Sequence, residues 1–285
     1  MSAAIEGGIL YVVATPIGNL GDITLRALEV LRAVPLIAAE DTRITRRLLT
    51  RYEIPTKTVS YHAQSDPSRL DSLLVHLRGG ADLALVTDAG TPGISDPGED
   101  LVTAWGAQGG RVVPIPGASA VLAAVVASGI AGPRWGFEGF LPRRGRERRA
   151  RLSRIAAYDR ATVMYEAANR LAATLGDLAA ACGPERRGAV CRELTKLHEQ
   201  VVRGSLAELE AAVRDGTIPT RGEVALVIGP PDELATAEAI PGAPALEAAL
   251  EAVDGLVAGG LGRAEAARRV ATETGLPRRA LYRVK

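Results

Sequence analysis

The segment Arg192–Glu199, which reads RELTKLHE, holds the densest group of chemically capable side chains in the second half of the chain. Glu193, Lys196 and His198 can each hold or move a proton at a reacting group. If the segment is extended, alternation puts Glu193 on one side and Lys196 with His198 on the other. A solvated strand end also explains this composition, so the segment is a candidate catalytic site only if other elements surround it.

Four polar, glycine-rich segments follow expected strands in the first half: Thr15–Asp22, Glu40–Arg43, Asp88–Gly98 and Pro116–Ser119. In an open parallel sheet the carboxyl ends of the strands share one edge, and ligands bind at that edge. Glycines there let a ligand approach the backbone closely. None of the four segments matches a dinucleotide fingerprint or a P-loop, so nucleoside triphosphate binding has little support. Together they predict a ligand site at this edge.

These segments need a sheet to hold them, and the apolar pattern predicts one. Short apolar runs alternate with segments of helical period, at residues 9–14, 36–39, 58–61, 81–87 and 111–115. This alternation predicts a parallel sheet with helices on both faces. Asp66-Pro67 and Asp96-Pro97 each read as an N-cap followed by proline, so we predict that helices begin there. The second pair implies a structural role for Ser95, Asp96 and Pro97.

In the second half of the chain, strands and helices no longer alternate regularly. Strands are expected at residues 137–140, 162–165, 188–192, 199–203 and 224–228, and some follow one another without a helix, which predicts a mixed sheet with antiparallel pairs. Ser205 and Glu208 have the spacing of a capping box.

These patterns divide the chain into three parts. We predict an α/β domain at 1–131, a second α/β domain at 132–231, and a linker with a helical tail at 232–285. In the tail, residues 263–272, Gly275 and residues 277–283 read as helix, turn and helix. This pattern leaves contact with nucleic acid open.

The composition is that of an ordinary globular protein. Of 285 residues, 47% are hydrophobic and 24% are charged, and the net charge is +1. No apolar run approaches the roughly 20 residues of a membrane span, and no secretion signal is evident. The two cysteines lack the spacing of a metal site and read as buried thiols, so we expect no metal. A cytoplasmic protein without membrane contact is expected.

Arginine accounts for nearly all the positive charge, because only Lys57, Lys196 and Lys285 are lysines. The stretch Pro142–Arg154, PRRGRERRARLSR, is the most basic. Such runs are often merely solvated, but guanidinium groups suit phosphate, and we predict RNA contact by this stretch. The predicted RNA-binding residues are Arg43, Arg143, Arg144, Arg146, Arg148, Arg149 and His198; Arg43 is included because helix capping does not explain it.

The order of the motifs TPIGNLGDIT, AEDTR, DAGTPGISDPG, PGASA, CRELTKLHE and GEVALVIG resembles the tetrapyrrole-methylase superfamily from about Leu10 to Ile228. AEDTR and CRELTK resemble the branch that methylates ribosomal RNA. The resemblance implies two α/β domains with S-adenosylmethionine in the cleft between them, and a homodimer. It also implies methylation of the 2′-hydroxyl of a cytidine in the decoding region of 16S rRNA, at family position cytidine 1402. The implied substrate is this rRNA within the small ribosomal subunit.

The residues that match the family's cofactor-binding positions are implied to contact the cofactor. They are Pro16, Ala89, Gly90, Thr91, Ile94, Ser119, Ala120, Tyr165 and Ala225. Thr91 stands where the wider superfamily has an aspartate. Either Thr91 itself or Asp88 takes the place of that aspartate, and the sequence leaves both open.

For methylation of a ribose hydroxyl, the nucleophile needs its proton taken or polarised. Lys196 is then the first candidate, for activating the hydroxyl or holding the neighbouring phosphate, with Glu193 orienting it or sharing the role of base. Glu138 is a weaker catalytic candidate. Two other readings remain: a corrin or porphyrin C-methyltransferase of the same fold, and an inactive cofactor-binding protein associated with RNA.

Overall fold

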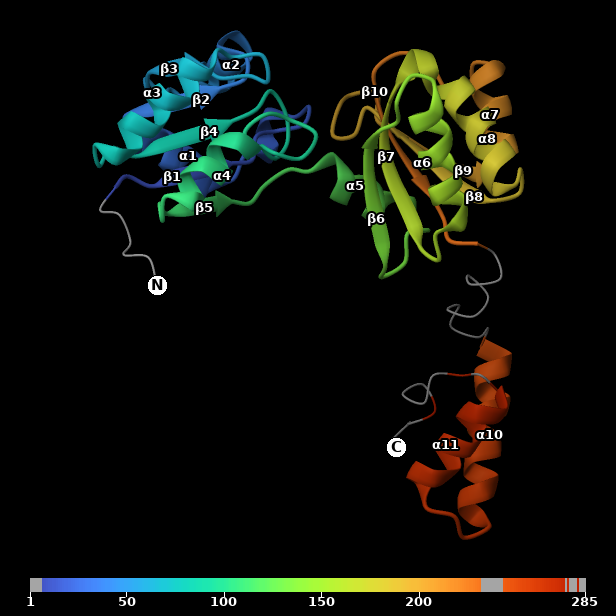
Figure 1. Cartoon of the computed structure of the whole chain (residues 1–285). Coiled ribbons are helices and arrows are strands. Elements are labelled where there is room, and N and C mark those ends of the chain that lie inside the picture. The colour runs from blue at the N-terminus through green and yellow to red at the C-terminus, as the bar shows by residue number, and fades with distance from the viewer. Residues whose placement is uncertain (1–6, 232–242, 275, 277–280, 282–285) are drawn as a thin grey trace. The chain divides into compact units, whose positions relative to one another are not determined.

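A computed structural model of the chain describes residues 7–231, 243–274, 276 and 281 (Figure 1). The chain divides into two compact units, residues 1–229 and residues 230–285. The first unit contains two separate five-stranded sheets. No helix within the described ranges is both long and apolar enough to cross a membrane.

The first sheet is wholly parallel, as predicted, and its strand order is β3-β2-β4-β1-β5. Its strands are β1 (Leu10–Val13), β2 (Leu36–Ala39), β3 (Thr58–Ser60), β4 (Leu83–Val86) and β5 (Val112–Ile115). Four helices connect them: α1 (Leu25–Ala33), α2 (Thr42–Arg51), α3 (Pro67–Arg78) and α4 (Glu99–Ala107).

Both faces of this sheet are covered, because successive strand residues point to opposite sides. Ile37 packs in a core with α1 and α2, whereas its neighbour Ala38 packs in a core with α3 and α4. Trp105 of α4 is fully buried in the second of these cores. Two-sided burial explains why β2 and β4 read as continuous apolar runs.

The second sheet is mixed, as predicted, with the order β6-β7-β10-β8-β9. Its strands are β6 (Trp135–Phe140), β7 (Ala161–Ala167), β8 (Arg187–Arg192), β9 (Gln200–Ser205) and β10 (Glu223–Ile228). Only β6 and β7 are parallel; the other neighbours are antiparallel.

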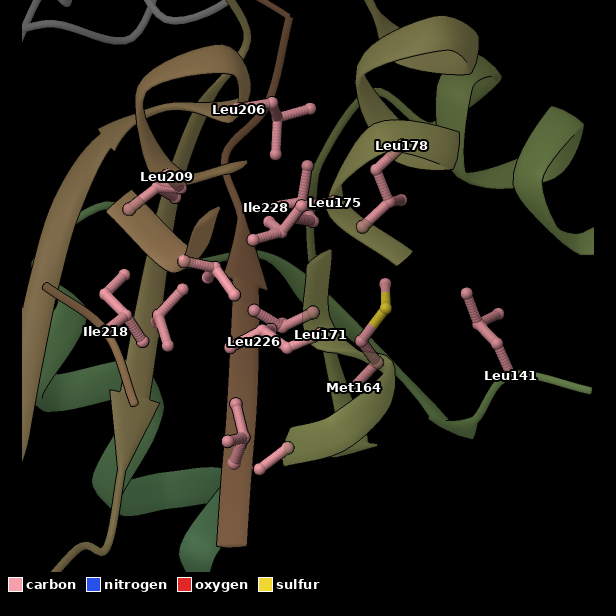
Figure 2. Close-up of a cluster of buried hydrophobic side chains, with 14 of the residues drawn as sticks. Leu141, Met164, Leu171, Leu175, Leu178, Leu206, Leu209, Ile218, Leu226 and Ile228 are labelled. Carbon is pink, nitrogen blue, oxygen red and sulfur yellow. The ribbon is translucent and has the colours of Figure 1, made fainter. Parts of the chain in front are cut away.

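Helices lie on both faces of the second sheet. One face carries α6 (Arg146–Ala157), α7 (Leu171–Cys182) and α8 (Leu206–Arg214), whose leucines fill the core shown in Figure 2. The other face carries α5 (Ala120–Ser128), where Val121 and Ala124 pack against Cys191 and Ala225. Helix α5 thus follows a strand of the first sheet but packs on the second, and the predicted boundary at 131 stays a prediction.

The 230–285 unit contains α10 (Ala243–Ala258) and α11 (Arg263–Thr274), packed through a small core that includes Val253 and Val270. The helix expected from Arg263 is confirmed, whereas α10 falls in a segment that we expected to be partly linker. The predicted second helix, residues 277–283, lies outside the described residues apart from Leu281.

Two of the three predicted helix N-caps are confirmed. Asp66 caps α3 with Pro67 behind it, and Ser205 with Glu208 forms a complete capping box at α8. The prediction at Asp96 is wrong. Helix α4 begins at Glu99, and its N-cap is Gly98 with φ +121°, a conformation that favours glycine. The carboxylate of Asp96 is therefore free of a capping role.

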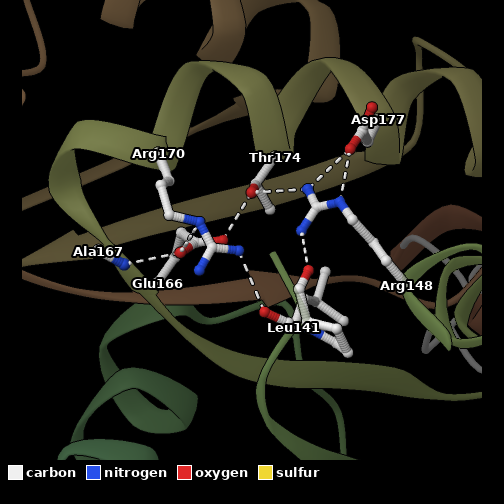
Figure 3. Close-up of polar contacts among 8 residues, drawn as sticks. Leu141, Arg148, Glu166, Ala167, Arg170, Thr174 and Asp177 are labelled. Atoms are coloured by element: carbon white, nitrogen blue, oxygen red, sulfur yellow. Dashed lines mark hydrogen bonds and ion pairs between the residues drawn. The ribbon is translucent and has the colours of Figure 1, made fainter. Parts of the chain in front are cut away.

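Arg148 anchors α6 to the second sheet through a buried polar network (Figure 3). Its guanidinium donates to Asp177 Oδ2 (2.8 Å), Thr174 Oγ1 (3.0 Å) and the Pro142 carbonyl (3.0 Å). Thr174 in turn donates to the fully buried Glu166 at 2.6 Å. Arg148 is only 7% exposed. This corrects our expectation that Arg148 binds RNA, because its donors are already used inside the protein.

The network makes Arg148 a stability residue, in contrast to its exposed neighbour Arg149. We expect Arg148→Ala to lower the free energy of unfolding by about 1 to 3 kcal/mol, because it removes a buried side chain and the donor to the buried Thr174 hydroxyl and the Pro142 carbonyl. The half-exposed Asp177 carboxylate can turn to water. Arg149→Ala should change it by less than about 0.5 kcal/mol. Urea titrations of both variants measure the difference; equal midpoints would show that the network contributes nothing.

Candidate functional site

The first and third glycine-rich segments are joined by a two-bond bridge. The Thr15 amide donates to the Gly90 carbonyl at 2.8 Å, and the Gly90 amide donates back to Thr15 at 3.0 Å. The Thr15 hydroxyl adds a bond to the Thr87 carbonyl at 3.0 Å. Gly90 has φ +77°, which disfavours any residue with a side chain. The bridge fixes both loops at the carboxyl ends of β1 and β4.

A cavity of about 570 Å³ opens beside this bridge, within the usual range for ligand sites. Both sheets contribute to its wall: Ile17, Gly90 and Thr91 come from the first, and Leu194 and Val224 from the second. Eight of the ten predicted cofactor-binding residues line it, namely Ala89, Gly90, Thr91, Ile94, Ser119, Ala120, Tyr165 and Ala225.

The other two predicted contacts, Pro16 and Asp88, do not line the cavity. Pro16 is buried next to the Thr15 bridge. Asp88 accepts the Asp41 amide at 3.0 Å, and its own amide donates to Glu40 Oε2 at 3.2 Å. Asp88 therefore braces the loop that begins α2. Of the two alternatives for the missing superfamily aspartate, only Thr91 reaches the cavity wall.

Asp96 supplies the carboxylate at the cavity that our sequence reasoning assigned to helix capping. It lines the wall, and no hydrogen bond or ion pair involves it within the part of the chain that the structure describes. Burial raises the pKa of Asp96 to about 6, with further contributions from the negative charges of Glu40 and Asp88. The sequence does contain one indication of this role, because Asp96 lies within Asp88–Gly98, the longest of the four glycine-rich segments.

Tyr165 faces the same cavity from β7. Its ring packs edge-on against Phe137, with 5.1 Å between centroids, and in a tilted arrangement against Phe140, with 5.4 Å between centroids. Burial raises the pKa of Tyr165 to about 12, and the charge of Asp96 adds to the shift. The phenol is therefore neutral at physiological pH and offers the cavity a polar hydrogen-bonding edge.

The segment RELTKLHE is a tight loop, and the predicted extended alternation is wrong. Glu193 and Thr195 both have left-handed backbones, with φ of 52° and 67°. This folding brings Lys196 Nζ to 2.9 Å from Glu193 Oε1 and 2.9 Å from Glu223 Oε2. Two residues that alternation would have separated thus form an ion pair.

Glycines of other loops make room for this ion pair. A Cβ at Gly18 would lie 2.4 Å from Lys196 Cγ, and one at Gly222 would lie 2.7 Å from the Glu193 carboxyl. The first glycine-rich loop therefore packs directly against the aliphatic part of Lys196. Desolvation lowers the pKa of Lys196, but the bonds from Glu223 and Glu193 outweigh it and the net pKa is raised. The backbone amide of Glu223 lowers the pKa of Glu193.

Glu138 lies at an irregularity of β6, where the register with β7 shifts. Its Oε1 accepts the Tyr158 hydroxyl at 2.9 Å, and the residue does not line the cavity. This placement does not support the catalytic role that we predicted for Glu138.

The candidate RNA-binding residues other than Arg148 are all exposed: Arg43, Arg143, Arg144, Arg146, Arg149 and His198. Arg43 differs from the rest because its guanidinium is paired with the Asp41 carboxylate, with Nη2 2.6 Å from Oδ2. This pairing lowers the pKa of Asp41 to about 2. His198 contributes its backbone carbonyl to Arg192 at 3.0 Å, which holds the loop together.

The cavity fits the S-adenosylmethionine that the motifs imply. Backbone of Ala89 and Gly90 is accessible on one side, Ile17 and Leu194 supply apolar wall, and the unpaired Asp96 carboxylate suits a positively charged ligand. Among the described residues no cluster of histidine, cysteine and acidic side chains could hold a metal ion.

Comparison with known proteins gives a consistent picture. Residues 9–210 match the family described as Tetrapyrrole (Corrin/Porphyrin) Methylases. The chain is 49% identical to ribosomal RNA small subunit methyltransferase I of Synechocystis sp., over 97% of each chain. It is 40% identical to the protein of the same name from Bacillus subtilis, over 96% of this chain and 93% of that one.

Solved structures share the fold at low sequence identity. Cobalt precorrin-4 methyltransferase superposes with a TM-score of 0.59 at 17% identity, covering 78% of this chain and 94% of that one. Uroporphyrin-III C-methyltransferase from Thermus thermophilus, solved in complex with S-adenosyl homocysteine, gives 0.55 at 20% identity, covering 80% and 99%.

The raised pKa of Asp96 predicts a stability cost. An aspartate in an unfolded chain titrates near pH 4, so between about pH 4 and pH 6 the folded state holds more protons. Stability therefore falls as the pH rises through this range, and the loss is complete above it. We expect Asp96→Asn to stabilise the protein at pH 8 by about 1 to 3 kcal/mol and to have little effect at pH 4.

Denaturant titration at the two pH values measures this effect. Asp66→Asn is the matched control, because the pKa of Asp66 is lowered by its bonds to Ser68 and asparagine also caps helices. A gain for Asp66→Asn equal to that for Asp96→Asn, or none for Asp96→Asn, would contradict the assignment.

Proposed function

The chain belongs to the tetrapyrrole (corrin/porphyrin) methylase family, within its branch of ribosomal RNA small subunit methyltransferases, and we propose that it methylates the ribose 2′-hydroxyl of a cytidine in 16S rRNA. It is a methyltransferase, and S-adenosylmethionine is its cofactor. The proposed target is the cytidine of the decoding region at position 1402. The proposed substrate form is the small ribosomal subunit, the proposed compartment is the cytoplasm, and a homodimer stays a prediction.

The observation that carries the proposal is the contact between the first glycine-rich loop and Lys196. Lys196 does not itself line the cavity, but Gly18 packs against its stem, and the adjacent Leu194 and the ion-pair partner Glu223 both line the wall. We therefore treat the RELTKLHE loop and the cavity as parts of one site. A cation held beside the cavity suits an anionic substrate, and the phosphate of a polynucleotide is one such group. The exposed arginines before and along α6 add support, since guanidinium groups suit phosphate.

The cofactor would lie against the backbone of Ala89 and Gly90, with Tyr165 and Ala225 on the opposite wall. When bound, it supplies a methyl group on a positively charged sulfur, ready for displacement by an oxygen nucleophile. The protein's part is to orient the ribose hydroxyl in line with that group and to exclude water. The apolar wall of Ile17 and Leu194 serves the second purpose.

Lys196 acts in this proposal as a cation and not as a base. Its two carboxylate partners raise its pKa, so the ammonium keeps its proton at neutral pH. It can hold the phosphate beside the target ribose or polarise the hydroxyl. Glu193 orients it, because the glutamate is itself fixed by the Glu223 amide at 2.9 Å.

Asp96 is the better candidate for accepting the hydroxyl proton. Its carboxylate lines the cavity without a partner among the described residues, and its pKa of about 6 leaves it ionised at neutral pH yet more basic than an ordinary aspartate. On this assignment, activity declines as the pH falls through about 6.

The proposed activity is tested with purified protein, labelled S-adenosylmethionine and small subunits from a strain that lacks the modification. We expect label in 16S rRNA, at the 2′-oxygen of a single cytidine. Label in a corrin or porphyrin with none in RNA would point to the C-methyltransferase reading. Label in neither substrate, with cofactor still bound, would favour the inactive RNA-associated protein. Both of these results contradict the proposal.

Lys196→Ala tests the role of the loop. We expect the rate of methyl transfer to fall by about 100-fold or more, since a positioned group that polarises the nucleophile contributes at least this much. Affinity for the cofactor, measured by calorimetry, should stay nearly unchanged. Lys57→Ala, an exposed lysine before β3, is the control and should retain full activity. A collapse of cofactor affinity in Lys196→Ala would mean that Lys196 serves the cofactor instead.

A further inference from the structure

Helix α2 carries a cluster of positive charge that has no role in the cavity or in the RELTKLHE loop described above. Its sequence, TRITRRLLTR, contains four arginines and no acidic residue, although the whole chain has a net charge of only +1. Thr45, Leu48 and Leu49 form its buried face. The arginines are therefore confined to the outer surface of the helix, which connects β2 to the edge strand β3 of the first sheet (Figure 1).

This outer surface is hollowed. Thr42, Arg43, Arg46, Arg47 and Thr50 line a shallow depression of about 420 Å³. Their spacing of three and four residues places them on one helical face. Arg43 is paired with Asp41, whereas Arg46 and Arg47 have no ion pair or hydrogen bond to a side chain among the described residues. The depression thus offers two uncommitted guanidinium groups between two threonine side chains.

The arrangement is unfavourable for the helix itself. Arg43 and Arg47 are four residues apart, as are Arg47 and Arg51, and like charges at this spacing destabilise a helix. Arg43 also lies in the first turn, where the helix dipole disfavours a cation. Of these arginines, only Arg43 is paired with a carboxylate from the part of the chain that the structure describes. An anionic partner on the α2 face would remove the repulsion among the remaining arginines.

We propose that the α2 face, defined as Thr42, Arg43, Arg46, Arg47 and Thr50, binds the phosphate backbone of the substrate RNA outside the cavity. The inference rests on the proposed function and adds a second contact surface to it. Planar guanidinium groups match phosphate oxygens in pairs, and threonine hydroxyls donate to the same oxygens. Contacts of this kind set position and affinity without reading sequence.

The place of α2 in the fold explains how such a contact would serve the reaction. The helix is capped by Asp41, whose amide is held by Asp88, and Glu40 before it lies close enough to Asp96 to influence its pKa. The α2 face therefore begins at the loop nearest the cavity carboxylates and runs outward from it. An RNA strand whose ribose enters the cavity could lay its neighbouring phosphates along this face.

The test compares two double variants with the same loss of charge. Arg46→Ala/Arg47→Ala removes the two uncommitted arginines of the α2 face. Lys57→Ala/Arg111→Ala removes two exposed cations at the amino ends of β3 and β5, the opposite edge of the same sheet. Binding of unmodified small subunits and of protein-free 16S rRNA is measured over a series of KCl concentrations, along with steady-state methyl transfer.

We expect the α2 variant to weaken binding to both forms of RNA by about tenfold or more. The slope of log affinity against log salt should become shallower by about 1 to 2, since each lost phosphate contact accounts for just under one unit. KM for subunits should rise while kcat and cofactor affinity stay unchanged. The control double variant should match the unaltered protein. Arg46→Lys/Arg47→Lys should restore the salt slope, because the charge is kept, but only part of the affinity, because an ammonium group lacks the paired donors of a guanidinium.

Three results would overturn the inference. One is an α2 variant indistinguishable from the control while the unaltered protein methylates RNA normally. Another is a loss seen with intact subunits but not with protein-free rRNA, which would assign the face to a ribosomal protein. The last is a fall in kcat or in thermal stability, which would show a structural role. If the unaltered protein methylates no RNA, the proposed function is rejected. The inference about the α2 face is then tested separately, by comparing how the two double variants bind RNA.

Discussion

The bridge between Thr15 and Gly90 is the constraint on which the candidate site depends. A parallel sheet brings the loops after β1 and β4 to one edge, but it does not decide how far apart they lie. Two backbone bonds and the Thr15 hydroxyl fix that separation. The left-handed conformation of Gly90 makes the geometry possible. With these loops fixed, Ile17 and Gly18 become a surface on which the cavity and Lys196 can be assembled.

The two carboxylates of greatest interest in the first unit have opposite surroundings. Glu166 is fully buried and receives Thr174, Arg170 and its neighbour's amide, so its charge is satisfied within the protein. Asp96 is partly buried near Glu40 and Asp88, and no described side chain satisfies it. Burial of an unpaired charge is destabilising, and carboxylates left without a partner in this way are concentrated at functional sites. The difference separates a structural acid from a functional one.

Arginine plays at least three roles here, and the residue type alone does not distinguish them. Arg148 is buried and ties α6 to α7 and to the wall of the site. Arg43 neutralises the carboxylate that caps α2. Arg46 and Arg47 project into a shallow depression without a side-chain partner among the described residues. A run of arginines in a sequence is therefore a mixture of structural and recognition residues, and burial decides between them.

The sequence by itself determined the elements and the edge at which they meet. Apolar runs alternating with helical segments predict the parallel order of β1 to β5, most strongly at β2 and β4, which are buried on both faces. Eight of the residues that the motifs imply as cofactor contacts line one cavity. Local rules failed where a distant partner overrides them. Asp96-Pro97 has the form of a helix cap, yet the N-cap is Gly98, whose φ of +121° and close approach to Leu85 both favour glycine. Glu193 and Lys196 meet because a left-handed turn folds their loop, and Arg148 turns inward because Asp177 and Thr174 are there to receive it. These outcomes depend on contacts between residues remote in the chain, which periodicity and capping signals do not contain; only the tertiary structure decides them.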